Sequence, residues 1–156
     1  MQWTFDHGEE LMQHAGTSEK GRTVSQFMTA DPVCADASSS IQQVADLLFS
    51  EDIRHVPILH EGRLFGIVSD RDMRTYAGSF LGSQPADRAA RLSKPISELC
   101  ESDVISVSPE DDIVEVIDLL VYHKIGALPV VEASSQRVVG IVSYIDVLRE
   151  VRNTIC

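Results

Sequence analysis

The sequence predicts a mixed α/β (α+β) fold made of two tandem copies of one β-α-β-β-α unit. The first observation behind this prediction is a repeated block, because Gly66–Asp72 returns as Gly140–Asp146 with the same glycine, apolar pair, serine and aspartate. The second is that shifting the chain by 72 residues, or by 74 after a short insertion, aligns many further positions. The third is size, since a unit of about 55 residues buries too little surface to be stable alone. We therefore expect the copies, residues 24–77 and 96–152, to press their sheets together into a shared core.

Each copy is expected to open with a short strand and continue into a helix. The apolar segments 33–35 and 104–107 are the strand candidates. In the second copy, Ser108 is the expected helix N-cap and Pro109 the first helical residue, with an acidic residue three positions after the cap. Apolar side chains then recur at helical spacing, at Ile41, Val44, Ala45 and Leu48 in the first copy and at Ile113, Val116, Ile117 and Leu120 in the second.

Two strands and a closing helix complete each copy. The strands are expected at 56–59 and 64–68 in the first copy and at 128–131 and 138–142 in the second. The closing helix is expected to begin at Ser69 or at Ser143, where a Ser-x-x-Asp pattern follows an apolar run.

Two segments lie outside the repeat. Residues 1–23 form an N-terminal extension, with a short helix expected at 9–14. Residues 78–95 form a connector, with a helix expected at 86–92. Neither segment carries a chemical motif.

Charge and composition exclude several classes of function. A net charge of -11 and a pI near 4.7 disfavour sequence-independent nucleic-acid binding, because an acidic surface repels phosphate backbones. The cysteines and histidines are scattered, which disfavours a disulfide framework and a metal site. No signal peptide and no apolar run of about 20 residues is visible, so we expect a cytoplasmic protein with no membrane span.

The repeated Ser-x-x-Asp pattern has two interpretations on residue chemistry alone. In the first, Ser69 and Ser143 are helix caps, and Asp72 and Asp146 complete a capping box. In the second, the same helix start binds a ligand, because its N–H groups and partial positive charge suit a phosphate. The carboxylate would then accept two ribose hydroxyls. Both interpretations stay open.

The two copies resemble cystathionine-β-synthase (CBS) domains in tandem, an arrangement called a Bateman module. The resemblance rests on residues 24–29, 53–58 and 66–72 in the first copy and on residues 96–100, 125–131 and 140–146 in the second. It implies two small α/β units packed sheet to sheet around a pseudo-two-fold axis. It also implies clefts that bind AMP, ADP, ATP or S-adenosylmethionine.

The resemblance implies roles for particular residues. Asp72 and Asp146 are the candidates for the ribose hydroxyls, with Ser69 and Ser143 beside them. The base is expected among apolar residues of the early strand and of the strand that carries the proline, namely Val33, Val56, Pro57, Ile105, Leu128 and Pro129.

The copies differ in charge at corresponding positions. Arg54 and Arg71 occur only in the first copy, where they are candidates to clamp a phosphate. Alternatively, they only offset nearby acidic residues on an acidic surface. Which cleft is filled, and whether both are, stays open.

The leading hypothesis is a regulatory sensor of an adenosyl ligand that acts on a separate, unknown partner protein. It requires no cofactor and performs no catalysis, because His55 and Cys34 lack the partners of an activated nucleophile. A homodimer is expected, formed by the helical faces that carry residues 41, 44 and 48 and residues 113, 116 and 120. The alternative is a structural or interaction module in which the Ser-x-x-Asp patterns are only caps.

Overall fold

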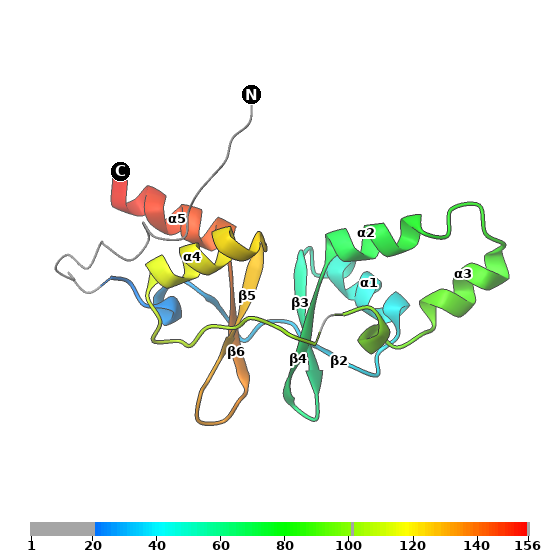
Figure 1. Ribbon diagram of the computed structural model, residues 1–156, viewed down its shortest axis with the longest axis horizontal. Coiled ribbons are helices and arrows are strands. Elements are labelled where there is room, and N and C mark those ends of the chain that lie inside the picture. The colour runs from blue at the N-terminus through cyan, green and yellow to red at the C-terminus, as the bar shows by residue number, and fades with distance from the viewer. Residues whose placement is uncertain (1–20, 101, 156) are drawn as a thin grey trace.

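Two three-stranded sheets lie near the middle of the molecule, with helices on their outer sides (Figure 1). The computed structural model describes residues 21–100 and 102–155. The first sheet has the order β2-β3-β4 and consists of Ala35–Asp36, His55–His60 and Arg63–Ser69. The second has the order β1-β6-β5 and consists of Thr29–Ala30, Val138–Ser143 and Ala127–Val131. The predicted α/β fold is confirmed.

Helices pack on the two sheets in separate sets. The helices of the first unit are α1 (Ile41–Ser50), α2 (Asp70–Gly78) and α3 (Pro85–Leu92), and those of the second are α4 (Ile113–His123) and α5 (Tyr144–Ile155). Short 3-10 turns occur at Val24–Gln26 and Ile96–Glu98. The strand pairs, the helix starts at residues 69 and 143 and the connector helix agree with the predictions. The helix expected at 9–14 lies outside the described residues. None of the described helices combines the length and apolar character needed to cross a membrane.

The opening segment of each copy packs on the other unit. Val24 is fully buried in the core of the second unit, and Ile96 is fully buried in the core of the first. The backbone repeats this exchange, because Val24 N donates to Asp111 O at 2.9 Å and Ile96 N donates to Ser39 O at 2.7 Å. These bonds join positions that the 72-residue shift makes equivalent. The exchange gives the pair of units a two-fold relationship and ties them together.

The start of the second copy differs from its prediction. The N-cap of α4 is Asp112, whose carboxylate accepts the backbone N–H of Val114 at 2.8 Å, so the predicted cap at Ser108 is wrong. Ser108 instead opens a turn in which Asp111 N donates to its carbonyl at 3.2 Å. The early strands are also shorter than predicted, since β2 has two residues and Val107 forms only a bridge to Val130.

The helical faces that we expected to form a dimer are inside the monomer. Apolar residues of α1 and α4 that face the sheets are buried in the two cores, and these are Ile41, Val44, Leu48, Val116 and Leu120. The prediction that they form the dimer surface is therefore wrong. Ile113, the remaining residue of the predicted faces, is partly buried against the core of the second unit. The exposed large apolar side chains are Phe49 on α1 and Val114, Val121 and Tyr122 on α4.

Candidate functional site

Each Ser-x-x-Asp motif sits where a strand passes directly into a helix. Ser69 ends β4 and is the N-cap of α2, with an extended backbone (φ -109°, ψ 161°). The aspartate three residues on lies in the first helical turn, where its negative charge complements the exposed N–H groups. Ser143 and Asp146 occupy the same places between β6 and α5.

The hydrogen bonds within the two motifs are nearly identical. Ser69 N donates to Asp72 Oδ2 at 2.8 Å, Ser69 Oγ donates to the same oxygen at 2.6 Å, and Asp72 N donates back to Ser69 Oγ at 3.2 Å. In the second copy the corresponding distances are 2.8, 2.8 and 3.4 Å. Both capping boxes are therefore complete, and each serine hydroxyl proton already points to its own aspartate.

The two aspartates differ in their remaining oxygen. Asp146 Oδ1 lies 3.5 Å from the guanidinium of Arg149, and its side chain is only 12% exposed. Asp72 is exposed, and among the described residues its Oδ1 atom has no hydrogen-bond or ion-pair partner. The first motif therefore offers a carboxylate oxygen for an incoming hydroxyl donor, whereas the second shares its oxygen with an arginine.

In each copy, the strand that carries the proline pairs with the strand that ends at the Ser-x-x-Asp motif. His55 pairs with Ser69 and Pro57 pairs with Ile67 across β3 and β4. Ala127 pairs with Ser143 and Pro129 pairs with Ile141 across β5 and β6. The early segments complete the arrangement, because β2 runs beside β3 and Val107 N donates to Pro129 O at 3.1 Å. Val33 and Ile105, two residues before these contacts, are half-buried.

Two of the residues in the predicted contact with the base lie instead in the hydrophobic cores. Val56 and Leu128 are completely buried in the helix-side cores of the first and second units. Because side chains alternate along a strand, Pro57 and Pro129 lie on the opposite face from them. The side chains of Val56 and Leu128 thus face the helices, and Pro57 and Pro129, on the face away from the helices, are buried as well.

The two predicted arginines border the first motif. Arg54 lies next to it, because its carbonyl accepts the backbone N–H of Asp70 at 2.9 Å. Arg71 is in the first turn of α2. Asp70 pairs with Arg74 at 3.1 Å, and neither Arg54 nor Arg71 forms an ion pair within the described residues. Their guanidinium groups are exposed and available to an anion.

His55 and Gly126 bring the two units into contact, which the repeat alone did not indicate. A Cβ atom on Gly126 would lie 2.9 Å from Nε2 of His55. Burial lowers the pKa of His55 below 6.5, although the nearby carboxylates of Asp70 and Asp72 act in the opposite direction. A neutral imidazole therefore packs against the backbone of the second unit, at the edge of the first motif.

The residues considered for catalysis do not form a reactive group. Burial raises the pKa of the Cys34 thiol, which favours the unreactive protonated form. That thiol donates to the carbonyl of Pro32 at 3.3 Å. Residues 21–100 and 102–155 also contain no cluster of three His, Cys, Asp or Glu side chains suited to a metal ion.

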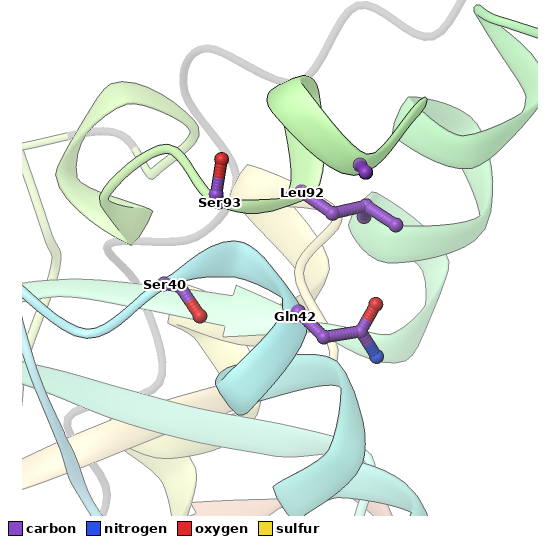
Figure 2. A pocket seen from close by; sticks show the side chains of 5 residues that line it. Ser40, Gln42, Leu92 and Ser93 are labelled. Atoms are coloured by element: carbon purple, nitrogen blue, oxygen red, sulfur yellow. The ribbon is translucent and has the colours of Figure 1, made fainter. Parts of the chain in front are cut away.

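A cavity of about 430 Å³ lies elsewhere in the first unit (Figure 2). It is bounded by the start of α1 and the end of α3, through Ser40, Gln42, Ala89, Leu92 and Ser93. None of the predicted site residues lines it, and its lining carries no charged side chain. We assign no ligand to it.

Comparisons with known proteins agree with the fold. An uncharacterised protein of Methanocaldococcus jannaschii, MJ1225, is 28% identical over 134 residues, which are 84% of this chain and 48% of that protein. The CBS domain-containing protein YhcV of Bacillus subtilis is 27% identical over 80% of this chain and 81% of its own length. The chain spans about half or less of the length of several other curated relatives that it matches.

A solved structure gives the same arrangement together with ligands. The CBS domain pair of protein MJ0100, in complex with 5′-methylthioadenosine and S-adenosyl-L-methionine, superposes with a TM-score of 0.70 at 28% identity. The match covers 85% of this chain and 98% of that one. The CBS domain family model matches residues 24–79 and 96–153, which together are more than half of the sequence. The resemblance seen in the sequence is thereby confirmed, and the chain belongs to the CBS domain family.

Proposed function

We propose that the protein is a regulatory module that binds an adenosyl compound and acts on a separate partner protein. The observation that carries the proposal is the duplicated Ser-x-x-Asp motif, set in the same geometry at two strand-to-helix junctions. The related CBS pair with 5′-methylthioadenosine and S-adenosylmethionine supports the choice of ligand class. AMP, ADP and ATP belong to the same class, and the module requires no cofactor and catalyses no reaction.

The first motif is the better candidate for a phosphorylated ligand. Asp72 Oδ1 is open to the ribose hydroxyls, and a carboxylate oxygen accepts such hydrogen bonds readily. Arg54 and Arg71, which form no ion pair with another described residue, bring positive charge to its edge, which suits a phosphate. Half-buried Val33 is the candidate for apolar contact with the base, whereas Pro57, predicted for the same contact, is buried in the structure. In the second copy Ser143, Asp146, Ile105 and Pro129 hold the equivalent places without arginines.

A panel of adenosyl compounds in a thermal-shift assay tests the proposal. A ligand at about 100 times its dissociation constant adds about 2.7 kcal/mol to the free energy of unfolding. We expect at least one of AMP, ADP, ATP and S-adenosylmethionine to raise the melting temperature. No shift with any of them would contradict the sensor function.

The variants must separate ligand binding from helix capping. Asp72→Ala removes both the candidate ribose contact and a cap of α2, so its apo stability is expected to fall by about 1 kcal/mol. Ser40→Ala is the matched control, because it removes the cap of α1 and leaves the motif intact. The ligand-induced shift, measured against each variant's own apo value, is expected to vanish in Asp72→Ala and to persist in Ser40→Ala.

A structural or interaction module is the second candidate. It is favoured by the completeness of both capping boxes, since Ser69 Oγ would have to release Asp72 Oδ2 at 2.6 Å before donating to a phosphate. In that case every motif variant would lower stability as a cap variant does, and no adenosyl compound would bind wild type.

We also propose that the protein is a homodimer. Phe49 on α1 is 90% exposed and Val121, its equivalent under the 72-residue shift, is 70% exposed. Because a two-fold interface uses the same patch on both partners, equivalent apolar positions suit self-association. Light scattering is expected to give twice the mass of the chain for wild type and the monomer mass for Phe49→Ser combined with Val121→Ser. A monomeric wild type would contradict it.

A further inference from the structure

Both helices of the second unit expose large apolar side chains. On α5 they recur at intervals of four, three and four residues, at Tyr144, Leu148, Val151 and Ile155. Residues at this spacing share one face of a helix. On α4, which packs beside α5 (Figure 1), the exposed apolar side chains are Val114, Val121 and Tyr122. Exposed apolar surface of this extent is typical of a contact with another protein.

The equivalent positions of the first unit are more polar. Under the 74-residue shift, Tyr144 and Leu148 correspond to two charged residues of α2. These are Asp70 and Arg74, which form an ion pair at 3.1 Å. Within α1, which the structure describes throughout, Phe49 is the one exposed large apolar side chain. The two units therefore present chemically different helical faces to a partner.

A two-fold homodimer can join these faces in two ways. The second unit meets either the second unit or the first unit of the other copy. If it met the first unit, its apolar side chains would cover helices that carry the Asp70–Arg74 ion pair, and removing those charges from water costs free energy that an apolar face does not return. If it met the second unit, apolar side chains would cover one another. Desolvation therefore favours contact between the two second units.

Charge favours the same arrangement. Asp118 lies within the exposed apolar set of α4, four residues after Val114 and three before Val121. Arg152 follows Val151 on α5. Both charged side chains are exposed, and neither forms an ion pair with another described residue. Setting α5 of one copy on α4 of the other brings these opposite charges together, and the two-fold axis repeats the pair.

The exposed apolar area is of the size that such a contact needs. An interface of standard size buries about 800 Å² on each partner. Tyr144 and Tyr122 are 45% and 78% exposed. Because an aromatic side chain has about 150–250 Å² of surface, these two supply roughly 200–300 Å². The exposed aliphatic side chains of α4 and α5 add to this area, so the two helices carry a large part of the surface that one partner contributes.

We propose that two copies of the chain pair through their second units, with α5 of each copy on α4 of the other and Arg152 facing Asp118 across the contact. This inference rests on the homodimer proposed above and adds which unit meets which. Because α5 begins directly after Ser143, one end of the contact lies beside the second Ser-x-x-Asp motif. The charged face of α2, which begins at the first motif, lies outside the apolar contact.

Exchange of the two charges, followed by analytical ultracentrifugation, tests this pairing. Arg152→Glu and Asp118→Arg are each expected to raise the dissociation constant of the dimer about tenfold or more, because each places like charges together. A double variant with both changes is expected to recover most of the wild-type affinity, since opposite charges again face each other. Circular dichroism checks that every variant keeps its helices.

Asp46→Arg is the matched control. Asp46 is equivalent to Asp118 under the 72-residue shift and is also exposed, but it lies on α1 and accepts a hydrogen bond from Gln42 Nε2 at 2.7 Å. It is not expected to restore the affinity of Arg152→Glu. Restoration by Asp46→Arg in place of Asp118→Arg would show that unlike units meet, which overturns the proposal and leaves the homodimer intact.

Two further results would contradict the pairing in different ways. Unchanged dissociation constants in both single variants would place the interface on another surface, although the protein is a dimer. A monomeric wild type would overturn this inference together with the homodimer. The adenosyl-binding function is judged separately, by the thermal-shift panel, so a failure of the pairing and a failure of ligand binding are distinguishable.

Discussion

Nε2 of His55 lies 2.9 Å from the position that a Cβ atom on Gly126 would occupy. The two residues belong to different units, and this distance is below the closest approach of ordinary Cβ contacts. Gly126 has no positive φ, so its role is to let the imidazole approach the backbone rather than to relieve backbone strain. The contact joins the two units at the edge of the first Ser-x-x-Asp motif.

Filling the space at Gly126 is expected to destabilise the pair of units. Gly126→Val introduces a branched side chain where the imidazole lies, and overpacking of this kind costs about 1–3 kcal/mol of unfolding free energy. The same substitution is expected to cost less in a His55→Ala background, because the space is then open. A double-mutant cycle by urea denaturation measures this coupling, and additive effects of the two changes would contradict the contact.

His55 is expected to make stability depend on pH near neutrality. Its pKa is lowered on folding, mainly by burial, so the unfolded chain binds the proton more readily than the folded one. The unfolding free energy should therefore fall as pH drops through the unfolded value of 6.5, and rise as pH increases. Urea denaturation at pH 5.5 and 7.5 measures the difference, which should be smaller in His55→Gln. An unchanged difference in that variant would assign the pH dependence to another group.

The corrected start of α4 makes a simple prediction. Asp112→Ala removes the side chain that caps the N–H of Val114, and loss of a cap costs about 1 kcal/mol. Ser108→Ala is the control, because its side chain has no capping hydrogen bond in the structure. Thermal denaturation should distinguish the two. Equal losses of stability in the two variants would contradict the assignment of Asp112, rather than Ser108, as the N-cap.

The exchange of opening segments predicts that each unit depends on the other. Ile96 belongs to the second copy in sequence but is completely buried in the first unit's core. Ile96→Ala is expected to cost about 2–5 kcal/mol, as for other buried aliphatic truncations. Ile105→Ala, at a half-buried position of the same copy, should cost less. Hydrogen exchange in Ile96→Ala should rise first in α1 and β3, and a rise confined to the second unit would contradict the exchange.

Local chemistry made much of the fold predictable. The strands β3 and β4 are two continuous apolar runs joined at Glu61-Gly62, and both Ser-x-x-Asp patterns begin helices as capping boxes do. Ser108 and Pro109 predict a helix start that the structure does not have. The helix begins at Ile113 instead, where the backbone N–H donates to the carbonyl of Arg22, a residue distant in the chain. The exchange of Val24 and Ile96 likewise depends on long-range contacts that no local pattern carries.

The candidate site was predictable in its residue types but not in its details. The repeat identified Ser69, Asp72, Ser143 and Asp146, because the same Ser-x-x-Asp pattern occurs at equivalent positions of the two copies. The alternation of β3 and β5 places Val56 and Leu128 in the cores, a distinction between faces that the resemblance alone did not supply. The inequality of the two aspartates depends on Arg149, which has no counterpart at the first motif.

Isothermal titration calorimetry tests the central claim most directly, with AMP and S-adenosylmethionine titrated into wild type, Asp72→Ala and Asp146→Ala. We expect saturable binding of at least one compound to wild type and a loss of affinity of at least about tenfold, or 1.4 kcal/mol, in Asp72→Ala. With AMP, Asp146→Ala is expected to change the affinity less, because the arginines border only the first motif. Absence of binding to wild type, or equal affinity in all three proteins, would contradict the account.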